Sequence, residues 1–209
     1  MSVDAVVRKF GAERGEAVAI GFSSATVVRL ERRKETLYYK AGAGVSAECD
    51  RLLWLGATDF PSPLVRDRGD DWMLTSELPG RDTSQPWPVA DRPAVIAAMA
   101  AGLRALHQLD VADCPFESPF PGTREVVTHG DFCAPNVFVD PETLRFTGML
   151  DVDSLGVGPR YVDLALMYNS LSNGLNPQYD GQAAAFVQAY GGDPLDSRIT
   201  YYIDLANAR

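Results

Sequence analysis

The sequence predicts an α+β protein that has a sheet-rich N-terminal lobe and a mainly helical C-terminal lobe. Three observations lead to this class. β-Rich runs gather in the first half of the chain, apolar residues at helical spacing dominate the second half, and a Pro-rich connector at 84–93 lies between them. Strands that come first and helices that follow are typical of α+β proteins. We therefore expect one domain at residues 1–79 and a second at 80–209.

Strands account for most of the first half. The β-rich runs are 17–21, 26–30 and 36–40. The last two flank a polar turn, so residues 26–40 are expected to form a hairpin with an antiparallel register. If Leu30 pairs with Leu37, then Lys40 lies opposite Val27 and close to the loop that contains Ser23 and Ser24.

A helix and a further strand complete this half. Ser46 is a suitable N-cap for a helix that runs to about residue 56. Glu48 shares one face of that helix with Leu52 and Leu55, and a carboxylate on an inward face needs a partner. Residues 72–78 are expected to form a strand that a Pro-Gly pair ends.

The second half is mostly helical. Helices are expected at about 91–108, 161–172, 180–190 and 194–206, with Asp180 as a cap and a Gly-Gly pair after residue 190 as a stop. A Pro-containing loop at 113–124 leads into a short β-rich run at 125–128, and residues 137–139 and 144–150 form a second hairpin. If Val139 pairs with Leu144, Asp151 falls opposite Phe132 and beside Asp131.

The composition excludes several classes of protein. The 209 residues include 19 Lys and Arg against 28 Asp and Glu, which gives a net charge of −9 and a pI of about 4.7. This acidic balance disfavours binding to nucleic acid and suits a cationic ligand. The longest uncharged apolar stretch, 93–103, is too short to cross a membrane, and charges at residues 4, 8 and 9 argue against a signal peptide. Three cysteines indicate a reducing cytoplasm and no disulfide framework.

The side chains best suited to catalysis and metal binding lie at the second hairpin. Its open end would bring together Asp131, Asn136 and Asp151. Oxygen-only ligands suit Mg²⁺, and phosphoryl transfer requires a positioned nucleophile and neutralised charge more than covalent work. Asp131 would accept the proton of an attacking hydroxyl, while Asn136 and Asp151 would hold the metal. The alternative is a turn-rich hairpin in which these side chains cap the backbone.

Lys40 and Glu48 of the N-terminal lobe are candidates for binding the phosphates of a nucleotide. Lys40 lies on a strand, and Glu48 comes from the helix that follows it. Paired in this way, Lys40 would reach the α- and β-phosphates of a nucleotide beneath the loop of Ser23 and Ser24. The alternative is an ordinary surface ion pair, but the inward position of Glu48 on its helix argues against it.

Eight runs along the chain carry a family resemblance: IGFSSATVVRL (20–30), LYYKA (37–41), ECDRLLWL (48–55), WMLTSELPG (72–80), LRALHQL (103–109), CPF (114–116), VVTHGDFCAPNVFVD (126–140) and LDVDSLGVGPRYVDLAL (150–166). Together they resemble the aminoglycoside phosphotransferase family, which are small-molecule kinases with the protein-kinase fold. The likeness is greatest to the 3'- and 3''-phosphotransferases. The HGDxxxxN run is its most specific part.

The resemblance implies a bilobal protein-kinase-like fold and transfer of the γ-phosphate of ATP to a hydroxyl of a small cationic molecule, an aminoglycoside antibiotic. It makes Asp131 the catalytic base, Asn136 and Asp151 magnesium ligands, and Lys40 a phosphate ligand with Glu48 as its partner. It also makes Ser76 to Leu78 the hinge whose backbone binds adenine, and Ser23 and Ser24 part of the phosphate loop. The implied cofactors are ATP and Mg²⁺, and the implied partner is a small-molecule substrate, with no nucleic acid and no membrane.

The chain departs from the family at four places. Asp153 and Ser154 stand where the family usually has Gly and Arg, and Ser24 stands where many members have Gly. Only residues 117–125 fill a connection in which members carry several dozen mainly helical residues that wall the aminoglycoside pocket. Of the acidic C-terminal substrate contacts, only Asp204 is kept. Two alternatives follow: a kinase of the same fold with another acceptor, and an inactive relative.

Four further polar residues are expected to serve the structure. His129 would brace the catalytic loop by hydrogen bonds, and Asp163 would start a helix or brace a loop. His107 is expected to be structural as well. Cys133 has neither a second cysteine nor a paired histidine, so it is expected to be a small packing residue.

Overall fold

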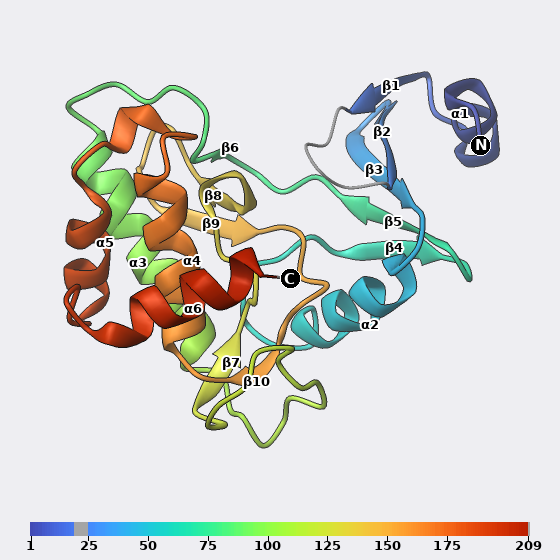
Figure 1. Ribbon diagram of the computed structural model, residues 1–209. Helices are drawn as coiled ribbons and strands as arrows, with labels where there is room; N and C mark the ends of the chain where they lie inside the picture. Colours follow the sequence, from blue (N-terminus) through green and yellow to red (C-terminus); the bar gives the residue numbers. More distant parts are fainter. Residues whose placement is uncertain (19–24, 209) are drawn as a thin grey trace. The chain divides into compact units, whose positions relative to one another are not determined.

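The computed structural model describes residues 1–18 and 25–208, and its internal contacts divide the chain into two units, Met1–Leu78 and Pro79–Arg209. The first unit is built on an antiparallel sheet and the second is mainly helical (Figure 1). The α+β class expected from the sequence is therefore confirmed. Within the described ranges, no helix is long and apolar enough to cross a membrane.

Five strands form the sheet of the first unit, in the order β1-β2-β3-β5-β4, and each neighbouring pair is antiparallel. Their bounds are β1 Arg14–Val18, β2 Thr26–Arg32, β3 Glu35–Ala41, β4 Val65–Arg68 and β5 Trp72–Ser76. Leu30 pairs with Leu37 and Val27 with Lys40, as predicted. The strand β4 was not predicted because its sequence, VRDR, is mostly charged, which is typical of a protected sheet edge.

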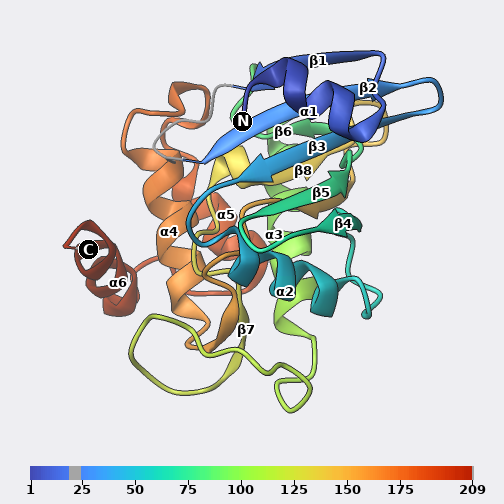
Figure 2. The same cartoon turned by 90° about the vertical axis from the view of Figure 1, so that its right-hand side faces the viewer.

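Two helices pack on this sheet. Figure 2 shows α1 (Val3–Phe10) beside β1 and β2, and α2 (Val45–Leu55) beside β4. The α1 side of the sheet holds a buried apolar cluster of Val6, Phe10, Val28, Leu30, Leu37, Tyr39 and Leu74. Because side chains alternate along a strand, Lys40 lies on the opposite face, where it meets Glu48 of α2. The pair of Lys40 and Glu48 is thus on the face away from α1, beside the buried Met73.

The helix α1 corrects the expectation of a single helix in this lobe. Its charged residues, Asp4, Arg8 and Lys9, are exposed, while Val6 and Phe10 are buried. Val3, Val6, Val7 and Phe10 follow the i, i+3, i+4, i+7 spacing of an amphipathic helix, a signal that the prediction overlooked. A helix of only eight residues depends on this packing for its stability. The start of α2 is corrected as well, because the helix begins at Val45 and Ser46 is not its cap.

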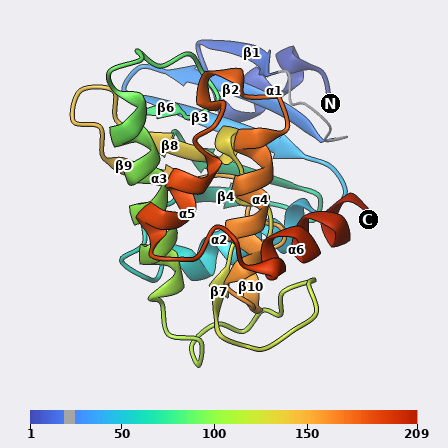
Figure 3. The same cartoon turned by 60° about the vertical axis from the view of Figure 1, so that its left-hand side comes forward.

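Four α-helices make up most of the second unit: α3 (Arg92–His107), α4 (Tyr161–Ser172), α5 (Ala183–Tyr190) and α6 (Ser197–Asn207). α5 packs against both α3 and α4, and α6 packs on α4 (Figure 3). All four helices were predicted, but Asp180 does not cap α5. A separate 3₁₀ turn, η2 (Pro177–Tyr179), uses the residues before it, so α5 begins later than expected.

Short strands form two small sheets in this unit. One has the order β6-β8-β9, with β6 at Arg81–Asp82, β8 at Val137–Val139 and β9 at Phe146–Met149. The other pairs β7 (Val126–Thr128) with β10 (Gly156–Gly158). Neither β6 nor β10 was predicted, because strands of two and three residues have no periodicity and form only against their partners.

The register of the hairpin of β8 and β9 differs from the prediction. Val139 pairs with Phe146 and not with Leu144. The carboxylate of Asp140 accepts the N–H groups of Glu142 and Thr143 at 2.8 Å each, which builds a larger loop than a simple turn. Leu144 closes this loop in the left-handed conformation, with a φ of 54°. A leucine gives no sequence signal for that conformation, so the register was placed incorrectly.

One close helix-to-strand contact in the second unit gives a stability prediction. A Cβ atom on Gly102 of α3 would lie 2.4 Å from Cδ2 of Phe146. We expect Gly102→Ala to lower the free energy of unfolding by about 1–3 kcal/mol through overpacking, even though alanine is the better helix former. The exposed control Ala101→Gly should lose only about 1 kcal/mol. Urea denaturation measures both, and a Gly102→Ala protein more stable than wild type would contradict this packing.

Candidate active site

The segment from His129 to Asn136 joins β7 to β8 and brings two predicted residues into contact. The Asn136 side-chain amide donates to the Asp131 carboxylate at 3.1 Å and to the Asp131 backbone carbonyl at 3.0 Å. The 3₁₀ helix η1 (Ala134–Asn136) turns the chain back between them. Asn136 is buried, whereas Asp131 is accessible to solvent.

Asp151 reaches the same place from the other strand of the hairpin. The Leu150 N–H donates to the Asn136 carbonyl at 2.9 Å. Asp151 is the next residue in the chain, so this bond places it beside Asn136. Asp151 has a φ of 55°, a left-handed conformation that Asp and Asn adopt more readily than other side chains. Such residues persist where their surroundings fix them, and they gather at functional sites. The structure thus places Asp131, Asn136 and Asp151 together.

His129 ties the two strands of this site to each other. Its imidazole is fully buried, and Nδ1 accepts the Asp131 backbone N–H at 3.2 Å. Nε2 therefore carries the proton and donates to the Leu150 carbonyl at 2.9 Å. The predicted bracing role of His129 is confirmed, because both nitrogens are engaged in holding the backbone.

A buried carboxylate on α4 holds the start of the segment. Asp163 accepts the backbone N–H groups of His129 at 2.8 Å and Gly130 at 2.9 Å. Its Oδ2 also lies 3.0 Å from Nε2 of His107 on α3, and Nδ1 of His107 lies 2.8 Å from the Tyr190 hydroxyl on α5. The structural roles expected for Asp163 and His107 are confirmed, and three helices converge on this one segment.

Two residues that the sequence analysis missed hold the other end. The Ala134 N–H donates to Ser170 Oγ at 3.1 Å, and Thr83 Oγ1 donates to the Ala134 carbonyl at 2.7 Å. Ser170 lies two turns after Asp163 on the same face of α4. That spacing of polar residues on an apolar helix was the signal for Ser170. Thr83 lies in an irregular segment and had no comparable signal.

The turn that follows Asp151 packs against Gly130. Gly130 has a φ of 79°, and a Cβ atom there would lie 2.5 Å from the Ser154 carbonyl oxygen, so only glycine fits. Asp153 lies in the same turn and is exposed. Of the non-glycine residues that the structure describes, only Leu144 and Asp151 have a positive φ. The aspartate at 153 therefore does not strain the backbone, although the family usually has glycine there.

Although Asp131 as a residue is exposed, desolvation of its carboxylate raises its pKa above that of an ordinary aspartate. The surrounding protein desolvates the carboxylate, and the negative charges of Asp151 and Asp153 act in the same direction. The hydrogen bond from Asn136 opposes them. Burial also raises the pKa of the Cys133 thiol, which stays protonated, as a packing residue should.

The oxygen atoms of the site fit a hard divalent cation. Asn136 uses its Nδ2 group toward Asp131, which leaves Oδ1 as an acceptor with no bond to a described residue. Asp151 adds a carboxylate from the adjoining strand. Within residues 1–18 and 25–208, no three His, Cys, Asp or Glu groups gather closely enough to hold a metal alone. A cation bound by Asn136 and Asp151 therefore needs further oxygens, which phosphates and water supply.

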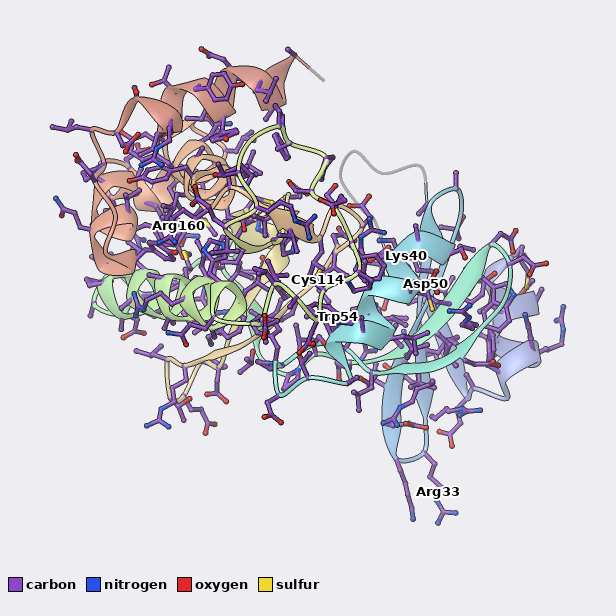
Figure 4. All side chains as sticks on the ribbon, turned by 90° about the horizontal axis from the view of Figure 1, so that it is seen from below. Arg33, Lys40, Asp50, Trp54, Cys114 and Arg160 are labelled. Carbon is purple, nitrogen blue, oxygen red and sulfur yellow. The ribbon has the colours of Figure 1, made fainter. Side chains whose placement is uncertain are left out.

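The first unit contains the predicted pair of Lys40 and Glu48. Lys40 Nζ lies 2.7 Å from Glu48 Oε2, and the side chains are only 17% and 5% exposed. Figure 4 shows Lys40 directed from its strand toward α2, where Asp50 and Trp54 are also labelled. This is not the surface ion pair of the alternative interpretation. The two charges are largely removed from water, which is costly unless the geometry is fixed.

The predicted hinge lies at the end of β5. The N–H of Ser76 donates to the Leu64 carbonyl at 2.9 Å, and the N–H of Glu77 donates to the Thr36 carbonyl at 3.2 Å. The N–H of Leu78 has no partner among the described residues, so it remains a donor for a ligand. Ser23 and Ser24 lie outside the described residues.

Asp204 and the short connection at 116–125 lie elsewhere in the second unit. Asp204 is exposed on α6, and in the described part of the chain no bond joins it to the Asp131 site. Tyr202, two residues before Asp204 on α6, donates its hydroxyl to the Pro121 carbonyl at 3.1 Å. The Val157 N–H donates to Phe116 at 2.8 Å, which fastens the connection to β10. The connection is therefore anchored by both β10 and α6.

Two segments of the chain, residues 15–126 and 119–199, match the phosphotransferase enzyme family. The chain belongs to this family. The two segments meet at residues 119–126, within and just after the short connection. This phosphotransferase therefore departs from its family at the place where the sequence indicated a shortened chain.

Similar proteins agree with this assignment. The aminoglycoside 3'-phosphotransferase of Streptomyces fradiae is 32% identical, over 93% of this chain and 95% of that enzyme. The crystal structure of an aminoglycoside-3'-phosphotransferase of type VIII is 29% identical, covers 98% of both chains and has a TM-score of 0.83. An aminoglycoside phosphotransferase from Streptomyces rimosus, in complex with ADP and streptomycin, is 25% identical over 96% of this chain and 94% of that one, with a TM-score of 0.75.

The phosphotransferase described here is short within its family. The alignment with the Streptomyces fradiae enzyme spans 254 positions and this chain has 209 residues, so at least 45 positions (254 − 209) have no counterpart here. The alignment covers nearly all of the relative, so the missing positions lie mostly inside the chain.

The role of Asp163 can be tested by its removal. We expect Asp163→Ala to lower the free energy of unfolding by about 2–5 kcal/mol, because two buried N–H groups and an imidazole lose their acceptor. Chemical denaturation measures the change. The exposed control Asp204→Ala should remain within about 0.5 kcal/mol of wild type. If both variants were equally stable, the carboxylate would not be what holds the segment.

The desolvated charge of Asp131 has a measurable cost in stability. A carboxyl group whose pKa is raised by folding destabilises the protein in its charged form, and this cost vanishes below the unfolded pKa of about 3.9. We therefore expect Asp131→Asn to raise the midpoint of thermal unfolding of the ligand-free protein at pH 7. The gain should disappear as the pH falls through the raised pKa toward about 4. Scanning fluorimetry across this range, with the exposed Asp59→Asn as control, gives the answer, and an equal gain at all pH values would refute it.

Proposed function

We propose that this phosphotransferase is an ATP- and Mg²⁺-dependent kinase whose acceptor is a hydroxyl of a small cationic molecule, an aminoglycoside antibiotic. The observation that carries the proposal is the contact of Asp131 with Asn136 beside Asp151, held in place by His129 and Asp163. These are the groups that phosphoryl transfer requires, namely a base and oxygen ligands for a cation. Membership of the family supports the reaction class.

In this proposal Asp131 accepts the proton of the acceptor hydroxyl. Its Oδ2 takes the hydrogen bond from Asn136, and the residue is exposed, so the carboxylate is open to a substrate. The hydrogen bond from the Asn136 amide fixes the orientation of the carboxylate before the acceptor binds, so less entropy is lost on reaching the reactive geometry. The raised pKa makes the carboxylate a stronger base than an ordinary aspartate.

Asn136 and Asp151 would hold the magnesium ion. When bound, Mg²⁺ supplies charge neutralisation on the phosphate oxygens. Asn136 contributes a neutral oxygen, and the left-handed backbone at Asp151 turns its carboxylate out of the hairpin ladder. The nearby Asp153 adds negative charge on the same side, so the site favours a cation of high charge density over an unaccompanied anion.

Residues 1–79, which comprise the first unit and the residue that follows it, would form the nucleotide-binding domain and bind ATP. Lys40 would contact the α- and β-phosphates while Glu48 keeps its ammonium group in place. The backbone of Ser76 and Leu78 would bind adenine, and Ser23 and Ser24 would belong to the loop over the phosphates. Residues 80–209 would form the catalytic and substrate-binding domain. The three free cysteines fit a protein of the cytoplasm, where ATP is available.

Two observations support an aminoglycoside as acceptor. The named relatives act on aminoglycosides, and one of the similar structures contains streptomycin. A chain of net charge −9, with Asp204 exposed on α6, favours a ligand with several amines. The shortened connection supports a second candidate, a kinase with a different acceptor, since the missing residues belong to the family's substrate wall.

The proposal predicts a specific activity. Purified protein incubated with ATP, Mg²⁺ and a panel of aminoglycosides should yield a phosphorylated product, detected by mass spectrometry. Asp131→Ala should lower kcat by about 10²–10⁴-fold, the usual effect of removing a general base. The exposed Arg145→Gln is a matched control, expected to retain wild-type kcat.

Each outcome separates the alternatives. ATP turnover with another hydroxyl acceptor, and none with aminoglycosides, would favour the second candidate. Binding of MgATP without turnover on any acceptor would identify an inactive relative and would overturn the proposal. Turnover that Asp131→Ala leaves unchanged would remove Asp131 from the role of base.

A further inference from the structure

A cavity of about 330 Å³ in the second unit includes none of the residues of the Asp131 site. It lies where α4 and α6 begin and α5 ends, and its polar lining comprises Glu125, Arg160, Tyr161, Tyr190 and Arg198. Figure 4 shows the labelled Arg160 among the helices of this unit. The volume is sufficient for a small molecule, at the lower end of the range for ligand sites. The proposed phosphoryl transfer does not use it.

Two carboxylates, Glu125 in the lining and Asp196 beside the lining residue Arg198, already accept hydrogen bonds. Glu125 accepts the Thr123 hydroxyl at 2.6 Å on Oε1 and Arg160 Nε at 3.0 Å on Oε2. Asp196 accepts Arg198 through both of its oxygens, at 3.0 Å from Nε and 2.7 Å from Nη2. These bonds hold the pKa of the Asp196 carboxyl well below its usual range. Each oxygen of the two acids accepts at least one hydrogen bond, and the arginines neutralise the charge of both acids, so the acids attract a cationic ligand less than free carboxylates would.

The arginines keep unused donors. Both terminal Nη groups of Arg160, and Nη1 of Arg198, have no hydrogen-bond partner among the described residues. Their side chains are 47% and 51% exposed, so the groups are open to a ligand. Arg198 is also fixed, because its guanidinium carbon lies 3.9 Å from the centre of the Tyr161 ring. The hydrogen-bonding capacity left at the cavity is therefore mainly that of donors.

The adjoining backbone has the same polarity. α4 and α6 both begin at this cavity, with the positive ends of their helix dipoles toward it. The Arg198 N–H of α6 already donates to Asp196 at 2.9 Å, so α6 contributes its dipole and not this N–H. The C-terminal end of α5 opposes these dipoles, but its Gly191 and Gly192 N–H groups cap the carbonyls of Gln188 and Val187. Oxygen atoms carrying negative charge are the partners that planar guanidinium groups and helix N-termini both bind.

We propose that this cavity is a binding site for a small oxyanion, a phosphate or carboxylate group held between the guanidinium groups of Arg160 and Arg198. The net charge of −9 repels anions at long range, so binding depends on these short-range donors. The volume admits a small phosphate ester or polycarboxylate. The site is independent of the proposed kinase activity, since neither arginine belongs to the Asp131 site.

Calorimetric titration of the full chain tests the site without ATP. Inorganic phosphate and citrate are titrated at constant ionic strength, with chloride as the blank. We expect saturable binding that Arg160→Gln and Arg198→Gln each weaken about tenfold or more, since each loses charged hydrogen bonds. Arg145→Gln, an exposed arginine elsewhere in the same unit, should bind as wild type does. Circular dichroism checks that the variants are folded, and Arg160→Lys, which keeps the charge, provides a milder substitution.

The outcomes are distinct from those of the kinase proposal. Binding of phosphate alone identifies a phosphate group as the ligand, and binding of both anions identifies any small oxyanion. Phosphate could also occupy the proposed nucleotide site, so the titration is repeated with Lys40→Ala, in which binding should persist. Loss of binding in Lys40→Ala with retention in both glutamine variants would overturn the proposal, and so would the absence of saturable binding in wild type.

Discussion

The order of the Asp131 site depends on one buried carboxylate, Asp163. Removing an anion from water costs several kcal/mol, which its partners must offset. Asp163 is fully buried and accepts bonds from two backbone N–H groups and from His107. Hydrogen bonds to a charged acceptor are about twice as strong as neutral ones. A segment without regular secondary structure thereby obtains the rigidity that helices and strands have from their own backbone bonds.

This interaction extends in two directions. Toward the site, His129, whose backbone Asp163 holds, donates a hydrogen bond to the Leu150 carbonyl and so fixes the backbone just before Asp151. Toward the helices, His107 connects Asp163 to the Tyr190 hydroxyl, which lines the donor-rich cavity. The same helix, α4, supplies Ser170 for the far end of the segment. A single straight helix therefore sets the separation between the two ends of the candidate catalytic segment.

The sequence predicted those elements that are determined by residues close together in the chain. The first hairpin was registered correctly because the pairing of Leu30 with Leu37 buries both side chains on one face of the sheet, whereas a slip of one residue would turn one of them outward. The second was not, because the left-handed Leu144 and the side-chain bonds of Asp140 add residues to its loop. The site residues were recognisable from the motif, whereas Thr83 was not, because its position against Ala134 exists only after β6 has paired with β8. Strands that need a partner and contacts distant in sequence have no local signal.

The shortened connection affects the two parts of the second unit differently. A flexible loop costs less entropy to close as it becomes shorter, by about 0.6 kcal/mol for each halving, so the deletion does not threaten the fold. The remaining residues are fastened to β10 through Val157 and to α6 through Tyr202. Neither contact reaches the bonds that order the segment around Asp131, which come from Asp163 and Ser170 of α4 and from Thr83, just after β6. The candidate catalytic segment and the shortened connection are therefore held by separate elements, so the connection can be short without loss of the bonds around Asp131.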